Sequence, residues 1–160
     1  QPPVSEADRA VARALEPFGR TGAAEAPYAI QHDLQQMMQE LVGIVRREDE
    51  MRRAVDRVRD LRDRARRVGV SGNREYNPGW HTALDLENLL TVSEAIALAA
   101  IERRESRGGH FRDDYPDKDP QYASFNIVVK QGGDGQMALE RRPIPPLPAE
   151  LAAIIEEQKA

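Results

Sequence analysis

Apolar residues recur at helical spacing in three long stretches of the chain, and each stretch predicts an amphipathic helix. The first begins near residue 28, the second spans about 48–68 and the third about 82–104. The third is the most apolar, so we expect its helix to be the most deeply buried. In the first stretch the apolar positions are three or four residues apart throughout, as in Ile30, Leu34, Met37, Leu41 and Ile44.

Residues that start and stop helices separate these stretches. Gly43 is expected to break or bend the first helix, and Gly69 and Gly72 end the second. The second helix has acidic residues in its first turn and arginines in its last, which suits the helix dipole. The turn residues within 70–81 predict a loop before the third helix. Three helices with one apolar stripe each predict an antiparallel, spectrin-repeat-like three-helix bundle over residues 28–104.

The segment before the bundle, residues 1–27, is expected to be a lead-in with one short helix. Ser5 and Asp8 have the spacing of a capping box, which marks the start of that helix. Pro17 and Gly19 are expected to end it.

The segment after the bundle, residues 105–160, has a different pattern. Apolar and polar residues alternate over 125–130 and again over 137–141, on either side of the glycine-rich segment 132–135, which predicts a β-hairpin. Prolines over 143–148 predict an extended bridge to a last amphipathic helix at about 148–158. We therefore expect a mainly α protein, one domain overall, in which the hairpin and the tail pack on the bundle.

Composition excludes several kinds of chemistry. The chain has 160 residues, a formal net charge of -4 and no cysteine. Disulfides, thiolate zinc sites and iron–sulfur ligation within the chain are thereby excluded, and no apolar run is long enough to cross a membrane. Because the first residue is Gln1 rather than an initiator methionine, we expect a fragment of a longer polypeptide.

The stretch 46–67 contains ten arginines and six acidic residues. It fits either a stripe that binds phosphates or a solvated helix with ion pairs between successive turns. Aromatic residues are absent from this stretch, so we favour the ion-paired helix and expect no nucleic-acid partner.

Other polar groups do not have the spacing of a known site. His32, His81 and His110 lack metal-ligand spacing, and the aspartates of 113–119 do not fit a calcium loop. The glycines of 132–135 lack the spacing of a phosphate cradle and lie between two strands. We assign no catalytic, cofactor-binding or metal-ligating residue to this chain.

The segment Glu105–Pro116 is the exception, because it concentrates arginines, aspartates and a histidine just past the third helix. Such a cluster can knit a loop together through charge-assisted hydrogen bonds, or it can offer a polar face to a second domain. The adjacent glycines allow a tight turn or the close approach of another chain.

This segment resembles the signature near the end of the flavoprotein subunit of succinate dehydrogenase and fumarate reductase. That pattern is Glu-Ser-Arg-Gly-Ala-His, followed by an arginine, an acidic residue, an aromatic residue and usually proline. Here Glu105 to His110 match it with Gly109 in the place of alanine, and Arg112, Asp114, Tyr115 and Pro116 match the rest. Weaker similarity covers most of the chain, including Leu34–Met38, Val45–Arg46, Asp85–Leu90 and Met137–Pro143.

The resemblance implies that the chain is the C-terminal helical domain of such an oxidoreductase. FAD and the dicarboxylate substrate would then be held by upstream FAD-binding and capping domains, and electrons would leave through an iron–sulfur subunit. The fragment itself would be inactive, without a cofactor of its own, and would brace the flavin domain and help subunits dock. It would lie in the cytoplasm, at the inner face of a bacterial membrane through partner subunits, with no direct membrane insertion.

The residues expected to contact another domain or subunit are those of the signature, namely Arg107, Gly108, His110, Arg112, Asp114 and Tyr115. Two alternatives stay open. One is the C-terminal domain of an L-aspartate oxidase, since that family shares the Glu-Ser-Arg-Gly motif; the hairpin and the proline-rich tail favour the dehydrogenase branch. The other is an autonomous helical interaction module.

Overall fold

The computed structural model describes all residues except 1–4, 21, 23–24 and 159–160. The chain divides into two units, residues 1–118 and 119–160. The signature segment therefore belongs with the helices, and the hairpin and tail form the other unit. That the hairpin and tail pack on the bundle stays a prediction.

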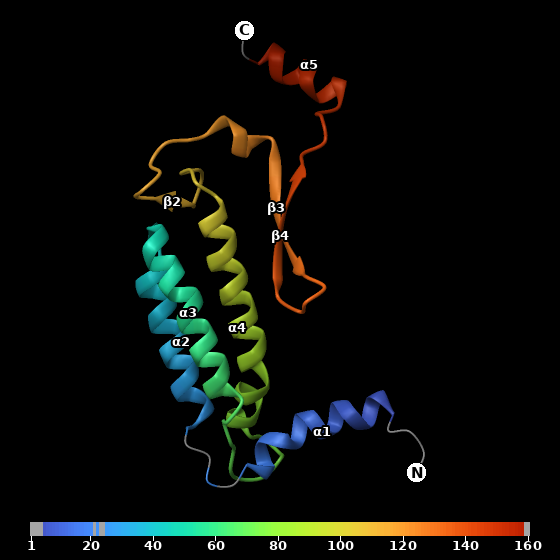
Figure 1. Ribbon diagram of the computed structural model, residues 1–160. Coiled ribbons are helices and arrows are strands. Elements are labelled where there is room, and N and C mark those ends of the chain that lie inside the picture. Colours follow the sequence, from blue (N-terminus) through green and yellow to red (C-terminus); the bar gives the residue numbers. More distant parts are fainter. Residues whose placement is uncertain (1–4, 21, 23–24, 159–160) are drawn as a thin grey trace. The chain divides into compact units, whose positions relative to one another are not determined.

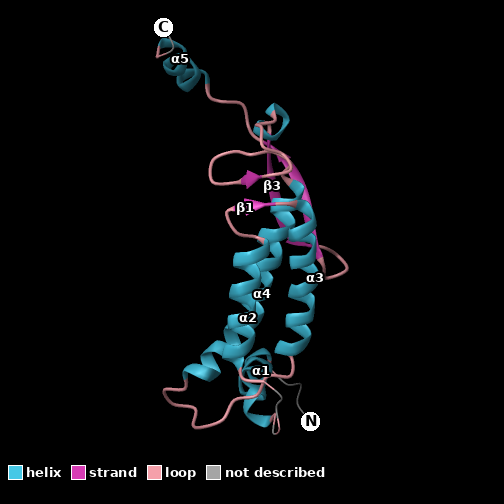
Figure 2. Ribbon diagram, turned by 90° about the vertical axis from the view of Figure 1, so that its left-hand side faces the viewer, coloured by secondary structure: helices cyan, strands magenta, loops and turns pink. Residues whose placement is uncertain are grey.

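Three long helices dominate the first unit (Figure 1). They are α2 (Pro27–Leu41), α3 (Glu48–Ala65) and α4 (Pro78–Glu102), and each packs against the other two. Successive helices run in opposite directions, as Figures 1 and 2 show. The predicted fold class, a mainly α protein with an antiparallel three-helix bundle, is confirmed.

The interior of the bundle is made from the predicted apolar stripes. Side chains that lie fully inside come from all three helices, including Ile30, Met51, Val58 and Leu90. Burying each such side chain contributes about 1.5–3 kcal/mol relative to leaving it in water. The α2 helix ends at Leu41, so the chain breaks the helix before Gly43 instead of bending there, and Ile44, which the predicted stripe included, lies outside the helix.

Helix α4 differs from its prediction in two ways. It begins at Pro78, about four residues earlier than expected, because the Asn77 side chain accepts a hydrogen bond from the Trp80 amide at 3.0 Å and so caps the helix. Proline at the first helical position has no amide hydrogen to leave unpaired. The expectation of deepest burial is correct for one face only, since Leu89, Val92 and Ile96 are exposed.

The predicted short helix at the start of the chain is α1 (Glu6–Gly19), and the Ser5–Asp8 capping box is present. Pro17 lies within its last turn and is buried. The Trp80 indole N–H donates to the Ala14 carbonyl oxygen at 2.7 Å, and the Phe18 and Trp80 ring centroids are 5.4 Å apart. These contacts hold the end of α1 against the start of α4.

The second unit contains the predicted hairpin and the last helix. Strands β3 (Phe125–Gln131) and β4 (Met137–Pro143) are antiparallel, in a register that pairs Gln131 with Met137. A short 3-10 helix, η1 (Pro120–Ala123), precedes them, and the guanidinium of Arg141 lies over the Phe125 ring at 4.8 Å. Helix α5 (Ala149–Glu157) follows the proline-rich bridge, as expected.

The bundle core makes a direct prediction about two neighbouring leucines of α4. Leu90→Ala should lower the free energy of unfolding by about 2–5 kcal/mol, because Leu90 is fully buried and the change leaves a cavity. Leu89→Ala, one residue away but 37% exposed, should cost roughly 1 kcal/mol or less. Urea denaturation of both variants measures the two values, and equal losses would contradict this orientation of α4.

Candidate functional site

The signature loop, residues 103–117, follows α4 and returns to the connection between α2 and α3. It does so through two short parallel strands, β1 (Val45–Arg46) and β2 (Phe111–Arg112). Val45 is the partner of Phe111 in this pairing, and the Asp113 amide donates to the Arg46 carbonyl oxygen at 2.9 Å. The loop is therefore fixed to the end of the bundle by backbone hydrogen bonds.

The Arg112 guanidinium lies at the centre of the loop and is fully buried. Its Nε and Nη2 donate to the two carboxylate oxygens of Asp114 at 2.7 and 2.8 Å. Its Nη1 donates to three main-chain carbonyl oxygens at the C-terminal end of α4, those of Ala100, Ile101 and Arg103, at 2.9, 3.2 and 3.2 Å. Carbonyls at a helix C-terminus lack partners within the helix, so a cation there both satisfies them and complements the helix dipole.

Asp114 connects the Arg112 guanidinium to the start of α3. Its Oδ2 accepts a hydrogen bond from the Glu48 amide at 2.9 Å, at a helix start where Arg47 provides no side-chain cap. The Arg112 guanidinium lowers the pKa of the Asp114 carboxyl from 3.8 to about 2. Because the folded-state pKa is lowered, the stability from this group is present above pH 3.8 and is lost as the pH falls towards 2.

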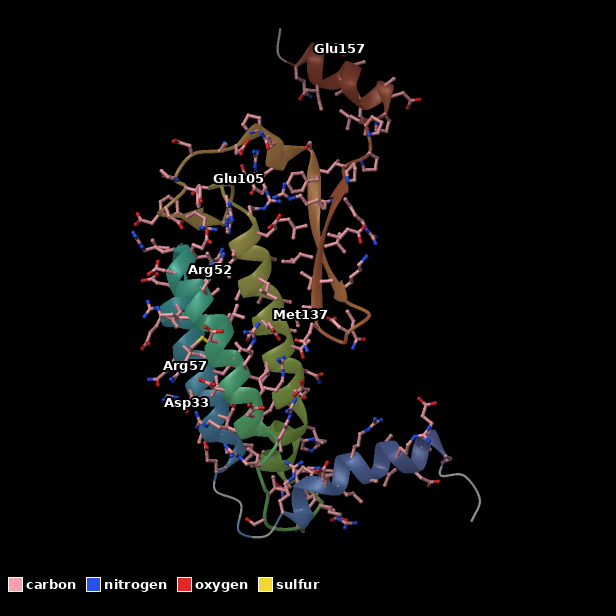
Figure 3. All side chains as sticks on the ribbon, viewed as in Figure 1. Asp33, Arg52, Arg57, Glu105, Met137 and Glu157 are labelled. Carbon is pink, nitrogen blue, oxygen red and sulfur yellow. The ribbon has the colours of Figure 1, made fainter. Side chains whose placement is uncertain are left out.

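Glu105 is a second fully buried charge, just beyond the end of α4 (Figure 3). It accepts from Arg103 at 2.6 Å and from Nε and Nη2 of Arg107, both at 2.9 Å. Next to it, the Ser106 hydroxyl donates to the Tyr115 carbonyl oxygen and accepts from the Arg112 amide, both at 2.9 Å. Arg107 thus has a carboxylate partner within its own loop.

His110 links the loop to β1. Its Nδ1 lies 2.9 Å from Nη1 of Arg46, and its Nε2 lies 3.1 Å from the Arg103 carbonyl oxygen. A guanidinium can only donate and a carbonyl can only accept, so the imidazole is neutral with its hydrogen on Nε2. Burial lowers the pKa of His110, and the charges of Arg46, Arg112 and Arg103 act in the same direction.

The turn at the tip of the loop depends on Gly108. Arg107 and His110 exchange two backbone hydrogen bonds, at 2.8 and 3.1 Å, and close a tight turn. Gly108 has φ +60, in the left-handed region, and Gly109 does not have a positive φ. A Cβ at Gly109 would meet no atom within 4 Å, so the alanine that the resembled signature has there would fit equally well.

Part of the exposed surface at this loop is apolar and rich in glycine. Val45 is 58% exposed and its partner Phe111 is 40% exposed, while Ile44, Gly108 and Gly109 are exposed beside them. We call these five residues the loop face. Of the residues predicted to contact another domain, Arg112 lies inside, and Arg107, His110, Asp114 and Tyr115 hold the loop together, with the Tyr115 ring 4.9 Å from the Arg112 guanidinium carbon.

Four residues that complete this site were not among the predicted contact residues: Arg46, Glu48, Arg103 and Glu105, although Glu105 and Arg46 lie in segments that match the signature family. Charged residues at the two helix ends were the available signal for Arg103 and Glu48. The full burial of Glu105 could not be predicted from a charged segment without periodicity, because this side chain becomes buried only when the loop folds back.

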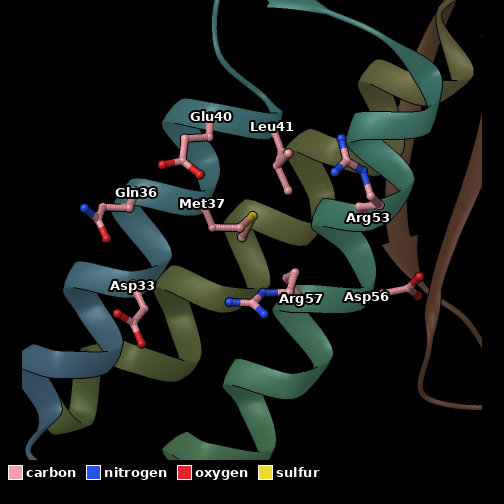
Figure 4. Close-up of a pocket in the computed structure, with 8 residues that line it drawn as sticks. All are labelled: Asp33, Gln36, Met37, Glu40, Leu41, Arg53, Asp56 and Arg57. Atoms are coloured by element: carbon pink, nitrogen blue, oxygen red, sulfur yellow. The ribbon is translucent and has the colours of Figure 1, made fainter.

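A groove between α2 and α3 is a weaker candidate (Figure 4). Its volume is about 520 Å³, and its lining is mostly polar: Asp33, Gln36, Met37, Glu40, Leu41, Arg53, Asp56 and Arg57. These side chains include no nucleophile with an adjacent base, and so the groove lacks the elements of a catalytic site.

The arginine-rich stretch is an ion-paired helix in this structure. Arg52 pairs with Glu48, Arg59 with Asp56 and Arg66 with Asp63 along α3 itself. Arg62 reaches Glu94 of α4 at 2.8 Å, and Arg64 pairs with Glu25 and Asp33. The arrangement favours the solvated, ion-paired helix over a phosphate-binding stripe.

Two further features bear on cofactors and membranes. Gly132–Gly135 joins β3 to β4 as the predicted hairpin turn, without a following helix, so it does not fit the pyrophosphate of FAD. Within the part of the chain that the structure describes, no three acidic or histidine side chains are placed to share a metal ion, and no helix could span a bilayer.

A family model described as "Fumarate reductase flavoprotein C-term" matches residues 31–152. The chain belongs to this family, the C-terminal domain of succinate dehydrogenase and fumarate reductase flavoproteins. The predicted resemblance is thereby confirmed.

Individual relatives agree with this assignment. The fumarate reductase flavoprotein subunit of Haemophilus influenzae is 36% identical over 88% of this chain and 23% of its own length. The succinate dehydrogenase flavoprotein subunit of Coxiella burnetii is 34% identical over 70% and 19%. An L-aspartate oxidase of Streptomyces coelicolor is 32% identical over 72% and 20%. The chain spans about a fifth of the length of these curated relatives.

Among solved structures, Mycobacterium smegmatis Sdh1 in complex with UQ1 contains a chain that is 39% identical, with a TM-score of 0.87. The match covers 97% of this chain and 27% of that one.

The two glycines of the turn should respond differently to alanine. Gly108→Ala should lower the free energy of unfolding by about 1–2 kcal/mol, because an alanine Cβ is strained at a positive φ. Gly109→Ala should be neutral or stabilise by about 0.4–1 kcal/mol, since it restricts the unfolded chain without a clash. Denaturant titration of both variants tests this, and an equal loss at the two positions would contradict the turn geometry.

The buried arginine should matter far more than an exposed one. Arg112→Met should destabilise the chain by about 3–5 kcal/mol, because Asp114 and three helix-end carbonyls lose their partner. Arg66→Ala removes a pair whose arginine side chain is 69% exposed and should cost less than about 1 kcal/mol. The measurement is urea unfolding followed by circular dichroism; a loss below about 1 kcal/mol for Arg112→Met would show that the loop does not depend on this pair.

Proposed function

We propose that this chain is the non-catalytic C-terminal helical domain of an FAD-dependent succinate dehydrogenase or fumarate reductase flavoprotein subunit. In that role it braces the flavin-binding part of the polypeptide and helps other subunits dock. The observation that carries the proposal is the organisation of the signature loop: its buried charges point inward, and its loop face points outward.

The inward charges make the loop rigid. Arg112 and Glu105 are fully buried, and Asp114 and Arg107 complete their ion pairs. A loop whose buried charges are already paired can dock against a neighbouring domain without leaving those charges unpaired, which would otherwise oppose association.

The outward face has the composition of a contact surface. Val45 and Phe111 are adjacent partners on two paired strands and are exposed together. Exposed apolar residues held side by side on a rigid element are typical of the centre of an interface. Gly108 and Gly109 have no Cβ, so the backbone of another domain can approach them closely.

The redox chemistry of such an enzyme would take place outside this chain. FAD would be bound by an upstream FAD-binding domain, the dicarboxylate would be enclosed by a capping domain, and electrons would pass to an iron–sulfur subunit. The described residues contribute shape and rigidity to that assembly. Its place would be the cytoplasmic face of a bacterial membrane, with membrane attachment through other subunits.

An L-aspartate oxidase-type parent is the second candidate, and the Streptomyces coelicolor relative is the observation that favours it. The dehydrogenase branch is preferred because more of this chain, including the hairpin, is matched by the Haemophilus influenzae fumarate reductase subunit. A third hypothesis is an autonomous interaction module, which requires that no flavin domain belongs to the same polypeptide.

A chimera tests the proposal. This chain should replace the matching segment of the Haemophilus influenzae fumarate reductase flavoprotein subunit and keep bound flavin and fumarate reduction, whereas the chain alone should show neither. Val45→Ser together with Phe111→Ser should reduce flavin retention and turnover of the chimera by roughly tenfold or more, which corresponds to about 1.4 kcal/mol of docking energy. The unfolding free energy of the isolated chain should change by about 0.5 kcal/mol or less, because both side chains are exposed.

The matched control is Val11→Ser on α1, since Val11 is 58% exposed, as Val45 is. It should leave the chimera active. A loop-face variant that behaves like this control would refute the docking role. A parallel chimera in the Streptomyces coelicolor L-aspartate oxidase identifies the branch: if only that host keeps its flavin and turnover, the second candidate is correct.

A further inference from the structure

We propose that His110 is a proton-sensitive latch, which ties the signature loop to β1 while its imidazole is neutral and releases it when the imidazole is protonated. The proposal rests on contacts within the first unit and does not require the docking role. Its outcome can therefore be judged separately from that of the chimera.

The two partners of the His110 ring have fixed hydrogen-bonding roles, because the Arg46 guanidinium can only donate and the Arg103 carbonyl oxygen can only accept. Arg46 is held in place because its Nε donates to the Val42 carbonyl oxygen at 3.2 Å, and its Nη1 then points at Nδ1 of His110, 2.9 Å away. A guanidinium stays protonated at all ordinary pH values, so Nδ1 must offer a lone pair. The opposite ring nitrogen donates to the Arg103 carbonyl oxygen. A second proton on the ring can only go to Nδ1, directly facing a cation.

The charges around the ring come from every element packed against it, and the closest ones are positive. Arg46 faces it from β1, Arg103 from the end of α4 and Arg112 from β2. The carboxylates of the same region are already engaged by arginines, Glu105 by Arg103 and Arg107, Asp114 by Arg112, and Glu48 by Arg52. None of these carboxylates is therefore free to compensate a positive charge on the His110 imidazole.

The latch holds the segment that presents the loop face. His110 closes the turn with Arg107, and the next residue, Phe111, pairs with Val45. Loss of the Arg46–His110 contact leaves β1 and β2 joined by their short backbone ladder and by the exposed Arg47–Asp113 ion pair beside it. Acid should thus open the turn and loosen the loop face before the bundle itself unfolds.

The direction of the pH effect follows from the lowered pKa of His110 in the folded chain. The unfolded chain takes up the proton near the ordinary value of 6.5, and the folded chain resists it. The stability from the latch is fully present above pH 6.5 and is lost as the pH falls below that value.

The test is NMR on the 160-residue chain, with long-range ¹⁵N spectra of the imidazole and hydrogen exchange of the amides of Arg107, His110 and Asp113. At about pH 7.5 the spectra should show hydrogen on Nε2 alone. Between about pH 7.5 and about pH 5.5, protection of the three amides, corrected for intrinsic exchange, should fall by roughly tenfold. His110→Gln keeps a neutral donor and acceptor and should show no such fall.

Three results would overturn the latch: hydrogen on Nδ1 in the neutral ring, protection in the parent chain that does not change with pH, or the same fall in His110→Gln. A second variant covers the case in which His110→Gln does not fold. Arg46→Met removes the facing cation and should move the His110 titration to higher pH, and an unchanged midpoint would also refute the proposal.

Discussion

The ion pair between Arg112 and Asp114 joins two helix ends of opposite polarity, and the rest of the loop depends on it. In an antiparallel bundle the C-terminal end of α4 lies at the same end as the N-terminal end of α3. The first exposes carbonyl oxygens and a negative dipole end, and the second exposes amides and a positive one. Arg112 binds the carbonyls and Asp114 binds the Glu48 amide, so one ion pair with a buried arginine satisfies both helix ends.

This arrangement explains how a strongly charged segment can form a rigid surface. A buried charge without a partner would cost several kcal/mol, and the two buried charges of the loop, Glu105 and Arg112, are both paired within it. The exposed positions include Gly108, Gly109 and the apolar side chains of Ile44, Val45 and Phe111. Paired charges in the interior and an exposed apolar face beside them support the proposed role of the loop in contact with another domain.

The sequence alone determined most of the fold. Helical periodicity placed α2, α3 and α4, the Ser5–Asp8 spacing placed α1, and two-residue alternation around a glycine run placed the hairpin. These features depend on residues that are close together in the chain, so local sequence patterns predict them well. The early start of α4 was not predicted, because Asn77 and Pro78 are as typical of a loop turn as of a helix N-cap and the first helical position.

The sequence also marked residues 105–116 as the segment with unusual chemistry and related it to a family of flavoproteins. What it could not determine was the direction in which each charge points. The partners of His110 and Asp114, namely Arg46 and Glu48, are more than sixty residues away, and they meet the loop only because the bundle returns the chain to the same end. Local composition decided that the loop would be polar. Only the tertiary structure decided that Glu105 and Arg112 lie inside while Phe111 is exposed, because burial depends on contacts between distant segments.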